Sequence, residues 1–230
     1  MAGALLVVAL VGGVALLGID LFHTRHSAPS PKGAQPTGSS TPATAPGTAV
    51  AAPPAPPGCG DITSLLASMS ARDKLAQLLM VGVTDAADAR AVVANQHVGG
   101  IFIGSWTDLS MLPDGELKAI SGSAGPLGLA VSVDEEGGRV QRLSKLIGSA
   151  PSARVLAQTQ TPDQVYQLAL DRGRKMHELG ITVDFAPVVD VTDAPDDTVI
   201  GDRSFSSDPA VVTQFAGEYA KGLRDAGVLP

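Results

Sequence analysis

Residues 61–230 alternate between short apolar runs and amphipathic segments of helical length. The runs are apolar at successive positions, not at every second one, which is typical of strands buried on both faces of a parallel sheet. Parallel strands joined through helices need right-handed crossovers, so the alternation predicts a parallel α/β fold. Two architectures satisfy it, the doubly wound sheet and the (β/α)8 barrel. The four runs are LLMVGV (78–83), HVGGIFIGS (97–105), LGLAVSVD (127–134) and ITVDFAPVVDV (181–191).

The segments between these runs carry helix start and stop signals. Residues 161–180 open on Thr-Pro, an N-cap followed by a proline in the first turn, and end at a glycine. Residues 208–227 open on Asp-Pro and also end at a glycine. The stretch 70–73 (SARD) resembles a capping box at the start of an earlier helix. Further helices are expected within 84–96 and 112–122.

The first 60 residues have a different composition from the rest. Residues 1–19 are uncharged and contain ALLVVALVGGVALLGI, which is long enough to span a membrane or to form the apolar region of an export signal. We therefore expect residues 1–26 to be a signal peptide or membrane anchor. The protein is then exported to the cell envelope, either anchored or secreted, and contacts the membrane only through this segment.

Residues 27–60 contain nine of the 17 prolines, and Lys32 is their only charged residue. Such a Pro/Thr/Ala-rich stretch cannot form a core, which predicts a disordered tether before the folded part, 61–230. Cys59 is the only cysteine, so an intrachain disulfide is excluded. Its proline-rich surroundings do not resemble a lipid-attachment site, and we expect an unpaired thiol.

Several classes of partner are excluded by charge and motif. The net charge is −7, with Asp20, Arg25 and Lys32 as the only charges before residue 61, which argues against nucleic acid as a partner. No GxGxxG follows the first strand and no GxxxxGK[ST] occurs, so nucleotide cofactors are not expected. The four histidines are scattered, and no Cys/His spacing indicates a metal site.

The stretch VDEEGGRVQRL (133–143) places three carboxylates directly behind the third apolar run. Two interpretations of Asp134, at the strand end, are possible. It is either a rigidly held acceptor for ligand hydroxyls, or a carboxylate that stabilises a turn or caps a helix. Glu135 and Glu136 invite a general-acid reading, because glycoside hydrolysis uses paired carboxylates. Adjacent residues of an extended segment point in opposite directions, so these two are not a ready-made pair. One is expected to face solvent or to pair with an arginine.

The same stretch continues with two glycines and two arginines. Gly137 and Gly138 are interpreted as turn residues that need an unusual φ or a close backbone approach. Arg139 and Arg142 share one face only if a helical turn begins there. One of the two could then clamp a ligand while the other neutralises the carboxylates.

A second polar cluster, DAPDDTVIGDRSFSSDP (193–209), follows the fourth run. A loop of this length is usually functional or disordered. Arg203 lies in it, near enough to the expected strand end at Asp190 to reach a common pocket. The alternative is a solvated loop arginine paired with Asp202 or Asp190.

Three motifs, VDEEGGRVQRL, VDFAPVVDV and VIGDRSFSSDP, occur in this order and together resemble the N-terminal half of family 3 glycoside hydrolases. The branch resembled is that of the bacterial β-N-acetylglucosaminidases (β-hexosaminidases), and the opening SARDKLAQLLM is similar to its exported, lipoprotein-type mycobacterial members. The resemblance covers residues 64–230. It implies a (β/α)8 barrel, and it implies that Asp134, Arg142 and Arg203 bind the N-acetylglucosamine ring in the −1 subsite.

The resemblance also implies an activity. Members of this branch remove terminal non-reducing β-linked N-acetylglucosamine from cell-wall sugars and recycled muropeptides, by a retaining mechanism through a covalent glycosyl-aspartate and without a cofactor. Two readings stay open beside it. One is a β-glucosidase of the same family, and the other is a non-catalytic exported protein that binds sugar.

The sequence departs from the family pattern in two respects. No lipid-attachment cysteine follows the apolar N-terminal run. The family's KHFPGHG-type segment, its mobile loop with the His–Asp acid/base pair and its nucleophilic aspartate are not found among the 230 residues. We therefore expect the catalytic groups to lie beyond Pro230, the chain to supply about the first half of the barrel, and this portion alone to be inactive.

Overall fold

The computed structural model describes residues 62–230. The expected membrane segment (1–26), the tether (27–60) and Cys59 lie outside the described residues. Within 62–230, no helix has both the length and the apolar character needed to cross a membrane.

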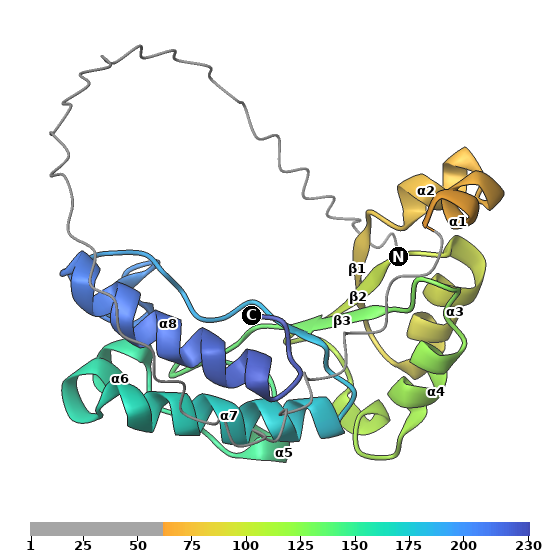
Figure 1. The fold of residues 1–230 in the computed structure, drawn as a ribbon. Coiled ribbons are helices and arrows are strands. Elements are labelled where there is room, and N and C mark those ends of the chain that lie inside the picture. Colours follow the sequence, from red (N-terminus) through yellow and green to blue (C-terminus); the bar gives the residue numbers. More distant parts are fainter. Residues whose placement is uncertain (1–61) are drawn as a thin grey trace, which may run out of the picture. The chain divides into compact units, whose positions relative to one another are not determined.

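Four parallel strands form the main sheet, in the order β1-β2-β3-β6 (Figure 1). Their residues are Met80–Val83, Gly100–Ile103, Ala130–Val133 and Val183–Asp184. Each new strand is added on the same side of the previous one. In a doubly wound sheet the order in which strands are added reverses at a switch point. In a (β/α)8 barrel each strand is added next to the previous one in chain order. The observed order therefore favours the barrel, and the predicted parallel α/β sheet is confirmed.

Helices connect the strands. The expected helices lie close to their predicted ranges, whereas the helices at 62–68, 144–147 and 153–159 and a small hairpin at 135–141 had not been predicted. The helices are α1 (Ile62–Ser68), α2 (Ala71–Ala76), α3 (Ala86–Gln96), α4 (Glu116–Gly122), α5 (Ser144–Ile147), α6 (Ala153–Thr159), α7 (Pro162–Glu178) and α8 (Pro209–Asp225); β4 is Glu135–Gly137, β5 is Val140–Gln141, and two short 3-10 turns cover Leu109–Met111 and Gly201–Arg203.

The predicted caps of the two long helices are confirmed. The Thr161 side chain accepts a hydrogen bond from the Gln164 amide, and the Gln164 side chain accepts one from the Thr161 amide, which completes a capping box at α7. Asp208 caps α8 by accepting from the amide of Ala210. Gly180 and Gly227 follow the two helices with φ of 90° and 87°, the left-handed conformation that glycine adopts without strain.

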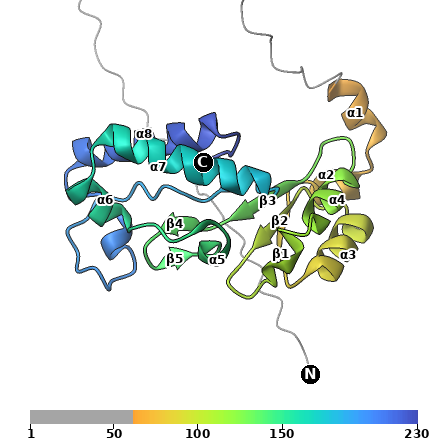
Figure 2. The same cartoon turned by 90° about the horizontal axis from the view of Figure 1, so that it is seen from below.

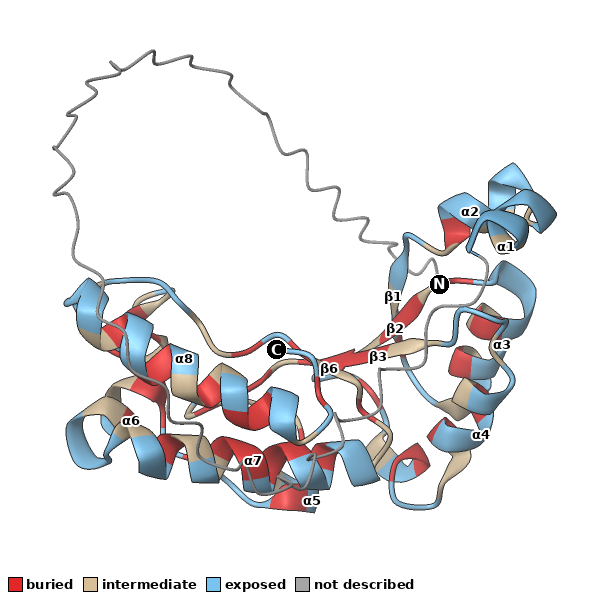
Figure 3. Ribbon diagram, viewed as in Figure 1, coloured by how far each residue is buried: buried red, intermediate tan, exposed pale blue. Residues whose placement is uncertain are grey.

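The core lies between the sheet and the helices. Ile101 and Ile103 of β2 and Val131 and Val133 of β3 are fully buried, all on one face of the sheet because side chains alternate along a strand. Phe102 lies on the opposite face and is only partly buried. In Figure 3 the buried residues run along the strands and along one side of α7 and α8. The buried face of α7 includes the apolar residues Val165, Ala169 and Met176. Arg172 lies among them and interrupts this apolar stripe.

The fourth strand is much shorter than predicted. The expected run 181–191 forms a strand only at Val183–Asp184, and the chain then leaves the sheet. Pro187 has no amide hydrogen, so it cannot donate a hydrogen bond to a neighbouring strand. This disfavours continuation of the strand through residue 187. The prediction that Asp190 lies at a strand end is therefore wrong. A single parallel bridge between Val183 and Leu229 continues the order of the sheet past β6.

Candidate functional site

The carboxyl end of β3 carries the charged stretch. Asp134 follows the strand directly, and β4 and β5 form an antiparallel hairpin immediately behind it (Figure 2). The two turn glycines behave as predicted. Gly137 and Gly138 have φ of 94° and 56°. A Cβ on Gly137 would lie 2.4 Å from the Pro151 carbonyl oxygen, so the hairpin packs against the chain too closely for a side chain.

The three successive carboxylates reach three different arginines. Asp134 pairs with Arg142 at 3.4 Å, Glu135 pairs with Arg172 at 2.5 Å, and Glu136 pairs with Arg203 at 2.7 Å. The side chain of Glu135 is completely buried beside α7, whereas that of Asp134 is 29% exposed. This alternation follows from the extended backbone and confirms that Glu135 and Glu136 do not point the same way as a ready-made pair would. Both glutamates pair with arginines, where only one had been expected to do so.

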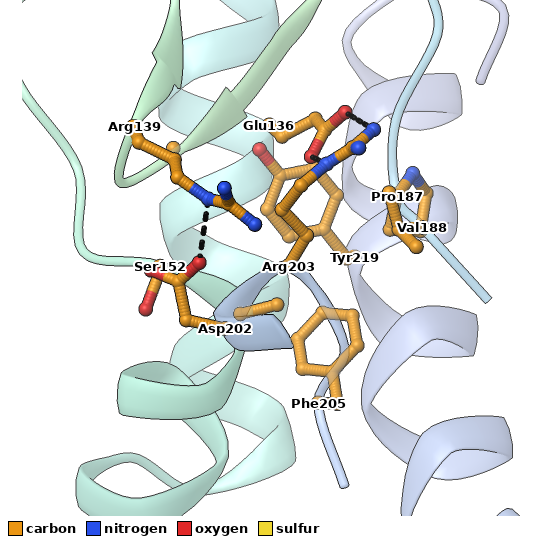
Figure 4. A pocket seen from close by; sticks show the side chains of 11 residues that line it. Glu136, Arg139, Ser152, Pro187, Val188, Asp202, Arg203, Phe205 and Tyr219 are labelled. Atoms are coloured by element: carbon orange, nitrogen blue, oxygen red, sulfur yellow. Dashed lines mark hydrogen bonds and ion pairs between the residues drawn. The ribbon is translucent and has the colours of Figure 1, made fainter. Parts of the chain in front are cut away.

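Arg203 is not a solvated loop arginine paired with Asp202 or Asp190. Its Nε and Nη2 atoms donate to the two carboxylate oxygens of Glu136 at 2.8 and 2.7 Å, a bidentate geometry (Figure 4). The Glu136 carboxylate raises the pKa of Arg203, and the charge of Asp134 adds to this effect. The two pairs, Asp134–Arg142 and Glu136–Arg203, therefore act on each other electrostatically across the end of β3.

Arg139 and Arg142 do not share a helical face, because a hairpin forms where a helical turn had been considered. Arg142 pairs with Asp134, whereas Nε of Arg139 donates to Asp202 at 2.9 Å. Arg139 Nη2 also donates to the carbonyl oxygens of residues 198–200. The long loop that precedes α8 is thereby attached to the hairpin.

A second arginine fixes the same loop from α6. Arg154 donates to the carbonyl oxygens of Thr192, Ala194 and Gly201, and it forms an ion pair with Asp196 at 2.6 Å. Carbonyl groups of a loop need such donors when no strand or helix satisfies them. The loop is consequently ordered, and it presents Arg203 to the hairpin at a fixed position.

Arg203 and Glu136 line a small pocket under the loop (Figure 4). Arg142 lines a different, more open groove, together with residues that follow β2. The three predicted sugar-binding residues thus lie at one end of the sheet, but Arg203 and Arg142 line different hollows and Asp134 lines neither of them. The pocket is lined by Glu136, Gly137, Arg139, Ser152, Ala153, Pro187, Val188, Asp202, Arg203, Phe205 and Tyr219.

A buried polar layer lies beneath this surface. One oxygen of Glu135 accepts from the backbone amides of Arg142 and Leu143, both at 2.7 Å, and the other pairs with Arg172. Arg172 also donates to the Gly148 carbonyl oxygen at 2.9 Å. Glu135 therefore holds the returning strand of the hairpin, which carries Arg142, against α7.

Asp184 completes this buried layer. It is fully buried, and its Oδ1 atom accepts from the Glu135 amide at 2.9 Å. Its other oxygen has no hydrogen-bond partner within residues 62–230. The pKa of Asp184 is raised to about 7, chiefly because the group is buried and in part because of the charge of the neighbouring Glu135 carboxylate.

Sequence reasoning did not single out Arg172 or Asp184. The arginine could have been noticed, because it interrupts the apolar stripe of α7 at a position that faces the core. A buried arginine needs a buried carboxylate. The sequence does not indicate which of 22 acidic residues after position 60 supplies it.

Asp184 should make stability depend on pH. The pKa of Asp184 is higher in the folded protein than its ordinary value of 3.8. Its stabilising contribution to the free energy of unfolding is therefore fully present below about pH 4 and is lost as the pH rises through about 7. Asp184→Asn keeps an acceptor for the Glu135 amide but cannot ionise. We expect the variant to gain stability relative to the wild type between pH 5 and pH 8, measured by urea unfolding.

The exposed Asp171, paired with Arg174 at 3.7 Å on the surface of α7, provides the control. Asp171→Asn should follow the wild-type curve. Parallel curves for Asp184→Asn and the wild type would contradict the raised pKa.

Within the described residues, no group of three or more His, Cys, Asp and Glu side chains could hold a metal ion.

Comparison with known proteins places the chain among carbohydrate-active enzymes. The family model described as the glycosyl hydrolase family 3 N-terminal domain matches residues 70–230. The beta-hexosaminidase LpqI of Mycobacterium tuberculosis is 66% identical over 199 residues, which are 86% of this chain and 51% of that protein. The chain therefore spans about half the length of this curated relative.

Solved structures give the same result. A family 3 glycosyl hydrolase from Mycobacterium smegmatis is 78% identical with a TM-score of 0.71, over 72% of this chain and 50% of the other. A family 3 beta-N-acetylglucosaminidase from Paenibacillus is 30% identical with a TM-score of 0.63, over 70% and 32% of the two chains. The predicted fold class is confirmed: the parallel sheet and its helices form the first half of a (β/α)8 barrel.

Proposed function

The chain belongs to glycosyl hydrolase family 3, and we propose that the whole protein hydrolyses terminal non-reducing β-linked N-acetylglucosamine residues. The relatives named above support this substrate, since one is named a beta-hexosaminidase and another a beta-N-acetylglucosaminidase. Cell-wall glycans and muropeptides are the proposed sources of the sugar. Export to the cell envelope is part of the proposal and rests on the sequence of residues 1–26.

The observation that carries the proposal is the double ion pair at the end of β3. Sugar hydroxyls both donate and accept hydrogen bonds, so a site that binds them needs acceptors and donors, and carboxylates and guanidinium groups supply these. The Asp134–Arg142 and Glu136–Arg203 pairs supply both, and the hairpin and loop hold them before any ligand arrives. In the proposed complex Asp134 accepts from hydroxyls of the −1 sugar, while Arg142 and Arg203 donate to it.

Three of the described carboxylates at this end of the sheet, Glu135, Glu136 and Asp184, are poorly suited to catalysis. Retaining hydrolysis needs a nucleophile and an acid/base group about 5–5.5 Å apart, on either side of the scissile bond. Glu135 is buried and bonded to Arg172 and two backbone amides, and Asp184 is buried in the same layer. Both oxygens of Glu136 are bonded to Arg203. We therefore propose none of these three carboxylates as the nucleophile or the acid/base group.

Relative turnover of two chromogenic substrates tests the proposed function. The whole protein should hydrolyse a nitrophenyl β-N-acetylglucosaminide and release the β-anomer first, which proton NMR detects. The corresponding β-glucoside should be at least about tenfold poorer, because a site whose polar groups bind the acetamido group leaves them unpaired with glucose. Preference for the glucoside would indicate the β-glucosidase instead. Binding of N-acetylglucosamine without turnover of either substrate would indicate a sugar-binding protein.

A further inference from the structure

Asp184 is a buried carboxylate that takes no part in the proposed sugar contacts. It pairs in register with Val133 of β3, so its side chain points into the core between the sheet and the helices. Residues 62–230 alone bury it completely, at 0% exposure, and any further chain can only add to this burial. Burying a carboxylate is costly unless it is paired or neutral, and its neighbours show what this one does.

Glu135, the residue that Asp184 contacts, is hydrogen-bonded at every polar atom. Its amide donates to Asp184 Oδ1 at 2.9 Å, and its carbonyl oxygen accepts from the Tyr219 hydroxyl at 3.4 Å. Its two carboxylate oxygens accept from Arg172 and from two amides at the end of the hairpin. This one residue is therefore fixed by β6, α7, α8 and the hairpin together.

The position of Glu135 sets the positions of the groups in the proposed sugar site. Asp134 and Glu136 lie on either side of it, and each pairs with one of the two arginines of that site. The Arg142 amide is also bonded directly to the Glu135 carboxylate, at 2.7 Å. A displacement of Glu135 is therefore transmitted to both ion pairs of the site, and most directly to Arg142.

One guanidinium group serves two buried carboxylates in this layer. Arg172 pairs with Glu135, but its charge also acts on Asp184. Nε of Arg172 and Oδ2 of Asp184 are both buried without a hydrogen-bond partner among the described residues. A single positive charge balances a single carboxylate, so Glu135 and Asp184 compete for Arg172 whenever both are ionised.

We infer that Asp184 is a positioning residue for the proposed sugar site, acting through Glu135, and this inference rests on the proposed function. A protonated Asp184 accepts from the Glu135 amide and leaves Arg172 to the Glu135 carboxylate, so the hairpin stays in place. An ionised Asp184 draws Arg172 away from Glu135, which then loses part of its attachment to α7. The sugar-binding side chains on the hairpin are then held less firmly, and sugar binds more weakly.

The direction of the resulting pH effect can be stated. The pKa of Asp184 is raised to about 7, chiefly because the group is buried. Since sugar binds better to the protonated form, its affinity should fall as the pH rises through about 7. The charged and titratable groups that face Asp184 are Glu135 of β4, Arg172 of α7, Tyr219 of α8 and Asp134 at the end of β3.

Calorimetric titration of the whole protein with N-acetylglucosamine at pH 6 and pH 8 tests the inference. Asp184→Asn keeps an acceptor for the Glu135 amide but cannot ionise. The ratio of the wild-type Kd to the Asp184→Asn Kd should therefore rise by about threefold to tenfold from pH 6 to pH 8. Groups that titrate elsewhere in the sugar site affect both proteins alike and cancel in this ratio. Asp184→Ala, which lacks the acceptor, should bind about threefold to tenfold more weakly than Asp184→Asn at pH 6.

Asp171→Asn, on the exposed side of α7, is the matched control, and its Kd should equal that of the wild type at both pH values. A ratio for Asp184→Asn that does not change with pH would overturn the inference. Lower melting temperatures of the Asp184 variants with unchanged affinities would assign the residue to the fold alone. If Asp184→Ala does not fold, the ratio for Asp184→Asn decides.

The titration also separates this inference from the proposed function, because it measures binding and not turnover. A whole protein that shows the expected ratio but hydrolyses neither chromogenic substrate would support the positioning role and overturn the hydrolytic activity. Hydrolysis of the N-acetylglucosaminide with a constant ratio would overturn the positioning role alone. A protein that neither binds N-acetylglucosamine nor hydrolyses its glycosides would overturn both.

Discussion

Replacing Glu135 with alanine should lower the free energy of unfolding by about 3–5 kcal/mol, because the buried Arg172 guanidinium loses its carboxylate. The side chains of both partners are almost entirely buried, at 0% and 7% exposure, so water cannot replace the lost partner. The amides of Arg142 and Leu143 lose their acceptor in the same step. Chemical unfolding of the whole protein monitored by circular dichroism measures the effect.

Two further variants separate the ion pair from the attachment of the hairpin. The double variant Glu135→Leu with Arg172→Met removes both charges, and replacing a buried pair with apolar residues is often close to neutral. Here it should recover only part of the loss, because the two hairpin amides still lack an acceptor. The exposed pair Asp171–Arg174 is the control, and its removal should cost less than about 1 kcal/mol. A loss that small for Glu135→Ala would show that the buried layer does not hold the hairpin.

Asp134→Ala and Arg203→Ala should each lower kcat/KM by about tenfold to a hundredfold, since a hydrogen bond to a charged group contributes about 1.5–3 kcal/mol. Asp134 is 29% exposed and Arg203 is 27% exposed, so both variants should remain folded. Arg203→Lys keeps the charge but cannot reproduce the bidentate contact with Glu136, and it should recover only part of the activity.

Arg174→Ala is the matched control for these variants, because Arg174 lies on the exposed side of α7 with its side chain 62% exposed. It should leave kcat/KM unchanged. Wild-type activity in Asp134→Ala would remove that residue from the sugar site, and a loss confined to thermal stability would assign it to the fold alone.

Local signals predicted the fold well where the chain's own neighbours decide the structure. The Thr161 and Asp208 caps and the glycines that follow α7 and α8 depend on contacts within one turn, and all were predicted correctly. The alternation of Asp134, Glu135 and Glu136 follows from an extended backbone. The short helix α6 was missed, since it is only seven residues long and the Ser152 side chain makes no capping hydrogen bond.

Pairings between distant residues could not be predicted. Glu135 and Arg172 are 37 residues apart, and Glu136 and Arg203 are 67 apart. Each pair forms because the sheet brings the hairpin against α7 and the loop before α8, which no local pattern encodes. The length of the fourth strand was overestimated, because the apolar run 181–191 does not show locally where the chain leaves the sheet. The strand ends at Asp184, before Pro187, and the apolar residues Phe185, Val189 and Val191 are exposed within the described residues.

A crystal structure of the whole protein with bound N-acetylglucosamine tests most directly whether the end of β3 binds the sugar. We predict sugar hydroxyls within about 2.7–3.2 Å of the Asp134 carboxylate and of the Arg142 and Arg203 guanidinium groups, with Glu135 still bonded to Arg172 beneath them. A sugar bound away from the carboxyl end of β3, or one whose hydroxyls reach none of these three side chains, would contradict the assignment.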